Sequence, residues 1–294
     1  MLEEKVKSGL CNLCNGSLSK PVFKKNGFYL VQCLTCGLFY VENQPSDTEL
    51  KKIYSFDTGY HKCFQYASSW QTKKQLNSGK RHYEYIKEYR KKGRILDMGC
   101  SAGFFLKVAK ENGWDTHGLE ISNDAAEIAR KRYGLDVLTG VLNYDTFPAG
   151  YFDVVSMWDF IEHVSDPVKM MSIINKILSP DGIVVLSTPN ADGLFARVAY
   201  KMSGIIGDWL HPEPPHHLFQ FSKKTIAKLL EVSGFRVLKI YDKRISIAYT
   251  FKSFKLLEWP LKRLLYFILL IPASIFGPMI GSGDLIIVIA KKGK

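Results

Sequence analysis

The stretch RILDMGCSAGFFLKV, residues 94–108, decides the fold of this chain. An apolar run ends at Met98, and Gly99 and Gly103 then enclose a loop of small residues before a second apolar run begins. Glycines at such positions let backbone approach a ligand closely, at the strand end where open α/β sheets bind their ligands. The stretch therefore predicts a strand, a ligand-binding turn and a helix.

Two other interpretations of this loop are considered. Residues 99–103 also match G-x-S-x-G, in which Ser101 would be the nucleophile of a hydrolase. That elbow normally follows several strands and a His-Gly oxyanion segment, whereas this loop follows the first strand of the series and no such segment precedes it. A dinucleotide fingerprint would need glycine where Ser101 and Phe104 stand. Ser101 is therefore interpreted as a loop residue.

The chain beyond this loop alternates between short apolar runs and helical patterns. Strands are expected at 94–98, 116–120, 136–139, 152–158 and 182–188, with helices at 104–112, 123–133 and 167–178. Residues 284–290 read as a last strand that pairs with residues 234–240. This alternation predicts an α/β fold with a Rossmann-like, doubly wound, mostly parallel sheet and an antiparallel last strand. Glu120 ends the second strand, where a carboxylate can accept both hydroxyls of a ribose.

Four of the six cysteines form two pairs near the start of the chain, Cys11-x-x-Cys14 and Cys33-x-x-Cys36. Two such pairs at this separation are typical of a tetrahedral zinc site. The segment between them alternates around Asn26-Gly27, a strong hairpin signal. We therefore expect a structural zinc ribbon, because four cysteine ligands leave no open position for catalysis. A redox pair or two disulfides are the alternatives. The N-terminus has no apolar signal segment, so a reducing cytoplasmic location is expected.

Five motifs in order resemble the class I S-adenosylmethionine-dependent methyltransferases. They are ILDMGCSAGFFL (95–106), THGLEIS (116–122), FDVVSMWDFIEHVSDP (152–167), LSPDGIVVLSTPN (178–190) and HHLFQFSKKTIAKLLEVSGF (216–235). The resemblance covers about residues 80–245. It is closest to the branch with ubiquinone-pathway O-methyltransferases and many bacterial glycan or natural-product methyltransferases, and the ribbon is similar to that of some sugar C-methyltransferases.

The resemblance implies that S-adenosylmethionine is the cofactor, with Zn²⁺ as a structural ion. It places the glycine loop around the methionine part of the cofactor, Glu120 on the ribose, and Ile121 and Leu142 beside the adenine. It turns Trp158 and Asp159 toward the sulfonium, where a carboxylate beside a cationic sulfur is electrostatically sensible. The loop residues carried over are Asp97, Gly99, Cys100, Ser101 and Gly103.

The expected domains are a zinc ribbon at 1–45, a helical linker or cap at 46–92, and a methyltransferase domain at 93–294 with an apolar insertion at about 255–283. Within the linker, HYEYIKEYRKKG (82–93) predicts a helix that ends with Gly93 as its C-cap. This helix either covers the cofactor mouth or simply packs on the domain.

Three histidines are candidates for the base that a hydroxyl acceptor requires. His163 follows the fourth strand, next to the expected methyl donor, and the alternative is that Glu162 and His163 only cap and pack a helix. His216 and His217 lie in a proline-rich loop after the fifth strand, and one of them is expected to face the substrate. A metal site formed by Glu162, His163 and His216 is a further alternative.

The acceptor is expected to be a small molecule or a glycan, with a lipid-linked sugar as an option, most simply methylated at a hydroxyl. Two other functions stay open: a methyltransferase-like scaffold with weak catalysis, and an RNA methyltransferase. The net charge of +12 suits nucleic acid, an anionic membrane or an anionic substrate. Nucleic acid is disfavoured because WDFI (158–161) stands where an N-P-P-Y motif is expected.

Residues 264–283 carry no charge over twenty positions. That length allows a membrane span, but prolines interrupt it. The strands expected before and after the insertion belong to one sheet, so both ends of the insertion must lie on the same side of a membrane. The preceding FKSFKLLEWPLKRLL (251–265) is basic and aromatic, the composition of an interfacial helix. The segment is therefore predicted to contact a membrane surface or lipid peripherally, and the alternatives are a hydrophobic lid and a dimer face.

Overall fold

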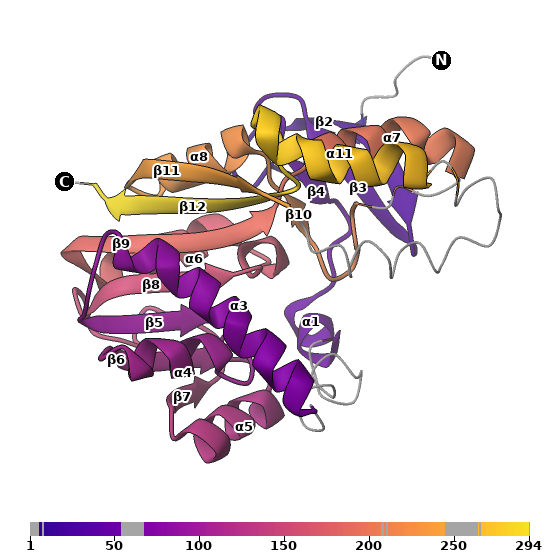
Figure 1. Cartoon of the computed structure of the whole chain (residues 1–294). Coiled ribbons are helices and arrows are strands. Elements are labelled where there is room, and N and C mark those ends of the chain that lie inside the picture. Colours follow the sequence, from indigo (N-terminus) through magenta and orange to yellow (C-terminus); the bar gives the residue numbers. More distant parts are fainter. Residues whose placement is uncertain are drawn as a thin grey trace.

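A seven-stranded sheet forms the body of the protein in the computed structural model (Figure 1), which describes residues 6–7, 9–53, 68–206, 209, 211–244, 264 and 266–293. Its strand order is β11-β12-β9-β8-β5-β6-β7. The strands from β7 to β9 are parallel, and β12 is antiparallel to both of its neighbours. The predicted mostly parallel sheet with an antiparallel last strand is confirmed. The strands are β5 (Arg94–Met98), β6 (Asp115–Glu120), β7 (Asp136–Thr139), β8 (Phe152–Trp158), β9 (Leu178–Pro189), β11 (Phe235–Lys243) and β12 (Leu285–Lys292).

Helices cover both faces of this sheet because alternate side chains of each strand point to opposite sides. In β5, Ile95 packs into one apolar cluster, and Leu96 and Met98 pack into the other. The first cluster is completed by α3, α4 and α5, and the second by α6 and α8. These helices are α3 (Ser69–Lys87), α4 (Phe104–Glu111), α5 (Asn123–Tyr133), α6 (Pro167–Ile177) and α8 (Lys223–Val232).

Helix α3 differs from the helix expected over 82–93. It begins much earlier, after a capping box between Ser68 and Gln71, and it ends at Lys87 with Glu88 as the C-cap. The prediction that Gly93 caps this helix is wrong. Gly93 instead adopts a φ of 141° beside Asp153, whose Oδ2 accepts a hydrogen bond from the Arg94 amide at 2.9 Å. A side chain at position 93 would collide with that carboxylate, so this glycine serves the entry into β5.

The cysteine-rich segment forms a second sheet with the order β1-β2-β3-β4-β10. The predicted hairpin at Asn26-Gly27 is confirmed, because both residues adopt positive φ values, 52° and 82°, as a two-residue turn requires. Its last strand, β10, lies in the chain between α7 and α8 and pairs with β4. The ribbon sheet therefore includes a strand from the body. Its strands are β1 (Val6–Lys7), β2 (Leu18–Lys25), β3 (Phe28–Cys33), β4 (Phe39–Val41) and β10 (Phe219–Gln220), and helix α1 (Asp47–Ile53) follows β4.

A helical layer lies beyond the carboxyl end of β9 (Figure 1). It consists of α7 (Leu194–Ile206), the π-helical turn η3 (Tyr266–Leu270), α11 (Ile271–Phe276) and the 3₁₀ turn η4 (Gly277–Ile280). Buried residues of α7, with Trp209 and Leu270, pack on Leu30 and Val41 of the ribbon. Among the described residues, no helix is long and apolar enough to cross a membrane. The interfacial helix predicted at 251–265 lies outside the described residues, apart from Leu264.

The crossing of α3 over α4 depends on Gly79. A Cβ at this position would lie 3.1 Å from the Phe104 carbonyl oxygen and 3.2 Å from the Phe105 Cα, both of them backbone atoms. We predict that Gly79→Val lowers the free energy of unfolding by about 1–3 kcal/mol through overpacking, measured by urea denaturation. The matched control is Gly204→Val in α7, where a Cβ would meet nothing within 4 Å and stability should change by less than about 0.5 kcal/mol. Equal stability of the two variants would contradict this account.

Candidate active site

A cavity of about 820 Å³ opens at the carboxyl ends of β5, β6 and β8 and is covered by α3. This volume is within the range of small-molecule sites. Every residue predicted to bind cofactor lines it except Gly103. The predicted residues at the cavity are Asp97, Gly99, Cys100, Ser101, Glu120, Ile121, Leu142, Trp158 and Asp159.

Glu120 holds the glycine loop in place. Its carboxylate accepts hydrogen bonds from the amides of Ser101 at 2.8 Å and Ser122 at 2.9 Å. Ser101 adopts a left-handed φ of 48°, which turns its amide toward this carboxylate. A carboxylate offers about four acceptor positions, so one that holds two amides can also accept hydroxyls of a bound ribose. Glu120 is thus both a loop anchor and the candidate ribose ligand.

Gly103 positions a helix instead of lining the cavity. It is the N-cap of α4 with a φ of 77°, and a Cβ there would lie 2.5 Å from Leu135 Cδ1 and 2.9 Å from Ala129 Cβ. Such contacts are too close for any side chain. The need for glycine at 103 therefore arises from the packing of α4 against α5 and not from direct contact with a ligand.

The aromatic wall of the cavity contains a histidine that the sequence did not indicate. His82, on α3, stacks on Trp158 at the end of β8, with ring centroids 3.9 Å apart and planes 9° apart. Burial lowers the pKa of His82 to about 4, so the ring is neutral near pH 7. The Nε1 of Trp158 is buried without a hydrogen-bond partner among the described residues. An unpaired indole donor at a cavity wall fits a polar ligand.

Two more carboxylates face the cavity from strand ends. Asp97 is almost fully buried and accepts a hydrogen bond from the Ser156 hydroxyl at 2.7 Å. Burial, with a smaller contribution from nearby Glu120, raises the pKa of Asp97 to about 8. Asp159, at a φ of 50°, accepts a hydrogen bond from Ser187 at 2.6 Å and is exposed at the cavity. Because burial disfavours the Asp97 anion, a cation in the cavity would stabilise it.

Of the three candidate histidines, only His163 lines the cavity. Its Nδ1 lies 2.7 Å from the carbonyl oxygen of His216. A carbonyl can only accept, so Nδ1 carries the proton and Nε2 of the neutral ring is the basic nitrogen. Burial lowers the pKa of His163 to about 4. His216 thus supports His163 through its backbone, and His217 packs edge-on against it, with ring centroids 4.8 Å apart.

A possible cation site differs from the predicted one by one histidine. Glu162, His163 and His217 each offer a ligand atom, all within 4.8 Å of one another. The prediction had His216 in place of His217. Glu162 accepts a hydrogen bond from Thr188 at 3.0 Å, while its Oε1 and the Nδ1 of His217 are buried without partners among the described residues. A carboxylate with two imidazoles can hold a divalent cation.

The four predicted zinc ligands converge in the ribbon. The Sγ atoms of Cys11 and Cys36 are 3.7 Å apart and those of Cys14 and Cys33 are 3.6 Å apart, with all four within 4.8 Å and no disulfide among them. Thiolates at about 2.3 Å from one tetrahedral ion would lie about 3.8 Å apart. Burial raises the pKa of the Cys11 thiol to about 11, which a bound cation would reverse. The donor set fits zinc.

Comparison with known proteins identifies the family. The sequence profile described as a methyltransferase domain matches residues 71–240, more than half of the chain. This chain belongs to the methyltransferase domain family. The ubiquinone biosynthesis O-methyltransferase of Psychrobacter arcticus is 31% identical over 105 residues, which are 33% of this chain and 41% of that protein. That of Colwellia psychrerythraea is 27% identical over 158 residues, 48% and 63% respectively. The methyltransferase thus spans 41–63% of the length of these curated relatives.

Solved structures show the same fold at low identity. A SAM-dependent methyltransferase from Archaeoglobus fulgidus has a TM-score of 0.52 and 19% identity, covering 74% of this chain and 94% of its own. The [4+2]-cyclase SpnF has a TM-score of 0.51 and 19% identity, covering 77% and 84%. One of these neighbours is named for methyl transfer and the other for a cyclisation, so the likeness establishes the fold and not the reaction.

We predict that the methyltransferase purifies with one zinc per chain, measured by atomic absorption, and that Cys11→Ser loses it. Because the ribbon sheet contains β10 from the body, the loss should lower the melting temperature by roughly 5–10 °C. Cys100→Ser, which alters a cysteine outside the cluster, should keep one zinc. A Cys11→Ser protein with full zinc content and unchanged melting would refute a structural metal site.

Proposed function

We propose that this methyltransferase transfers the methyl group of S-adenosylmethionine to a hydroxyl group of a small-molecule acceptor. The observation that carries the proposal is the Glu120-anchored glycine loop, which lines an open cavity of about 820 Å³ at the strand ends. The relatives named as ubiquinone biosynthesis O-methyltransferases support a hydroxyl acceptor. When bound, S-adenosylmethionine supplies a methyl group already activated by its cationic sulfur.

The chain's own residues bind and orient the reactants. Glu120 would accept the ribose hydroxyls, and the unpaired Nε1 of Trp158 would donate to a polar group of the ligand. The carboxylates of Asp97 and Asp159 would stabilise positive charge in the cavity. Helix α3 covers part of the cavity with His82 and Gly79 and would limit the access of water. These interactions supply the positioning and desolvation on which methyl transfer chiefly depends.

The proton of the acceptor hydroxyl would move to Nε2 of His163. This nitrogen is the basic one because Nδ1 donates to the His216 carbonyl. A base with a pKa of about 4 is a weak acceptor, but it is unprotonated throughout the neutral range. A second role for the same residue is favoured by the unpaired atoms of Glu162 and His217. With them, His163 would hold a divalent cation that binds the acceptor oxygen and lowers its pKa.

At a finer level we propose a glycan acceptor carried on a lipid. The exposed apolar side chains of α11 and η4 support this, because they lie in the helical layer beyond β9, at the same edge of the sheet as the cavity. A methyltransferase-like scaffold that binds cofactor weakly is the competing function, and RNA methylation is the third. A screen of acceptors with isotopically labelled donor distinguishes the three.

Calorimetric titration with S-adenosylmethionine tests the cofactor site. Glu120→Ala should weaken the Kd by about tenfold to a hundredfold, since it removes charge-assisted acceptors for two hydroxyls. Glu120→Gln keeps an acceptor for the loop amides and should lose less. Far-ultraviolet circular dichroism controls for the fold of each variant. The cofactor assignment fails if Glu120→Ala binds as tightly as the wild type.

His163→Ala should lower kcat by about a hundredfold or more, with a Kd for S-adenosylmethionine within about twofold of the wild type. Burial lowers the pKa of His163 to about 4, so the wild-type kcat should stay constant from neutral pH downward and fall only as the pH approaches 4, where the base becomes protonated. His216→Ala is the matched control, because His216 acts through a backbone carbonyl that the variant retains. A kcat that depends on added Mg²⁺ or Mn²⁺ after chelation would assign His163 to cation binding instead.

A further inference from the structure

We propose that the exposed surface of η3, α11 and η4 docks on a membrane that contains anionic lipids. We call this surface the apolar face and define it by its large exposed side chains: Ile268, Leu269, Ile275, Phe276, Met279 and Ile280. The docking itself requires no step of the proposed methyl transfer. A lipid-linked acceptor, which does rest on the proposed function, would be met at this surface.

The large apolar side chains of the apolar face point to solvent, whereas in an ordinary surface helix they point to the core. Met279 is 77% exposed, Ile280 67% and Phe276 56%. The opposite side of the same helical segment is buried and consists largely of small residues, including Ala273 and Gly277. In a helix that covers a core, the large apolar residues face inward. Large side chains outside and small ones inside indicate that the larger apolar surface is reserved for a partner.

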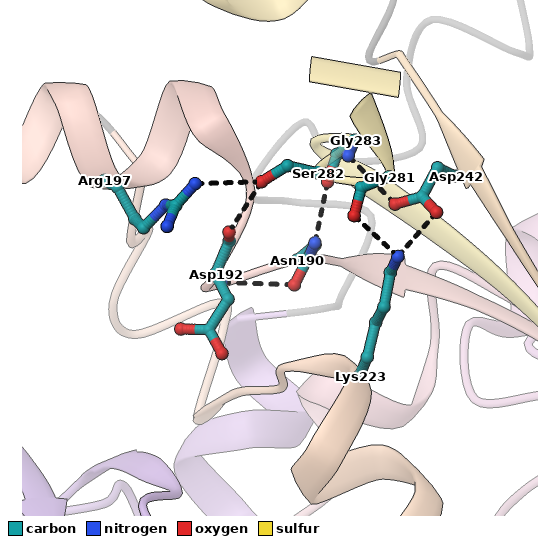
Figure 2. A network of polar contacts seen from close by, with 8 residues as sticks. All are labelled: Asn190, Asp192, Arg197, Lys223, Asp242, Gly281, Ser282 and Gly283. Atoms are coloured by element: carbon teal, nitrogen blue, oxygen red, sulfur yellow. Dashed lines mark hydrogen bonds and ion pairs between the residues drawn. The ribbon is translucent and has the colours of Figure 1, made fainter. Parts of the chain in front are cut away.

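Polar contacts fix the end of this segment to the body (Figure 2). Asn190, at the end of β9, donates to the Gly283 carbonyl at 2.7 Å. Lys223 donates to the Gly281 carbonyl at 2.8 Å and pairs with Asp242 of β11. The Arg197 guanidinium donates a hydrogen bond to the Ser282 hydroxyl at 3.2 Å. That hydroxyl in turn donates to the Asp192 carbonyl at 3.2 Å. The apolar face is therefore held in one orientation.

The topology places this face at a surface and not across a bilayer. Strands β11 and β12 are antiparallel neighbours, so the segment between them leaves and returns at the same edge of the sheet. Helix α7 starts at that edge, directly after β9, and α11 packs on it. The other side of α7 is buried against the ribbon. The apolar face is thus the outer surface of a layer whose inner surface is already covered.

The charges around the apolar face favour anionic lipid over a second copy of the chain. Helix α7, which packs on α11, carries the exposed residues Arg197, Tyr200 and Lys201. The segment from 264 to 283 itself contains no charged residue. Basic and aromatic residues beside exposed apolar ones are typical of interfacial segments. Two copies packed through this face would bring two basic borders together.

Flotation of the full-length, zinc-loaded protein with lipid vesicles tests the proposal. Phosphatidylcholine vesicles are compared with vesicles that contain roughly one-third phosphatidylglycerol. We expect the wild type to bind the anionic vesicles, and the bound fraction of the double variant Phe276→Glu and Met279→Glu to fall by about tenfold or more. Val232→Glu is the matched control, because Val232 is 51% exposed on α8, away from the apolar face. It should bind vesicles as the wild type does.

Three outcomes would overturn the proposal: no binding of the wild type to anionic vesicles, equal binding of the double variant, or a wild-type dimer in sedimentation that the double variant dissolves without any vesicle binding. Affinity for S-adenosylmethionine, measured on the same samples, should be equal in all variants and confirms that they fold. Vesicle binding without any cofactor affinity would refute the proposed function and leave the docking surface intact.

Discussion

The carboxylate of Glu120 binds two backbone amides, and the geometry of the candidate cofactor site depends on these bonds. One amide belongs to Ser101 in the turn after β5, and the other to Ser122, which caps α5 after β6. The amide of Gly99 reinforces the link by donating to the Leu119 carbonyl at 2.8 Å. A single residue thus joins the two turns between which the cavity opens. Because the same carboxylate is the candidate ribose ligand, a substitution of Glu120 would change both ribose binding and the geometry of the loop.

A second chain of contacts joins the ribbon to the side of the cavity that carries His163. Strand β10 pairs with β4, and the adjacent Leu218 accepts from the Val41 amide at 2.8 Å and donates to the Glu162 carbonyl at 2.8 Å. The Asn26 side chain donates to the Pro214 carbonyl at 3.0 Å in the same loop, whose His216 carbonyl binds His163. The four cysteines leave no open metal position, yet the ribbon influences the candidate base His163, because it contacts the loop whose His216 carbonyl binds the ring.

The sheet and the cofactor loop could be predicted from the sequence because they rest on local signals. Apolar runs, glycines at turns and an acid at a strand end require no knowledge of distant contacts. The stacking of His82 on Trp158 could not be predicted, since it depends on where a long helix crosses the sheet. The exchange of His216 for His217 beside His163 has the same origin. Adjacent residues of a loop face different directions, and only the pairing of β10 with the ribbon decides which one faces inward.

The chain carries a net charge of +12, yet Asp97, Glu120 and Asp159 bring three carboxyl groups to one cavity. Burial raises the pKa of Asp97, so this carboxyl group resists ionisation in the protein alone. Hydrogen bonds nevertheless hold the three carboxyl groups in place. Glu120 accepts from two loop amides, and the hydroxyls of Ser156 and Ser187 donate to Asp97 and Asp159. A cationic ligand would remove the penalty, because each ionised carboxylate gains an opposite charge in a poorly hydrated space. A positively charged group in the cavity would therefore stabilise this cluster of carboxylates.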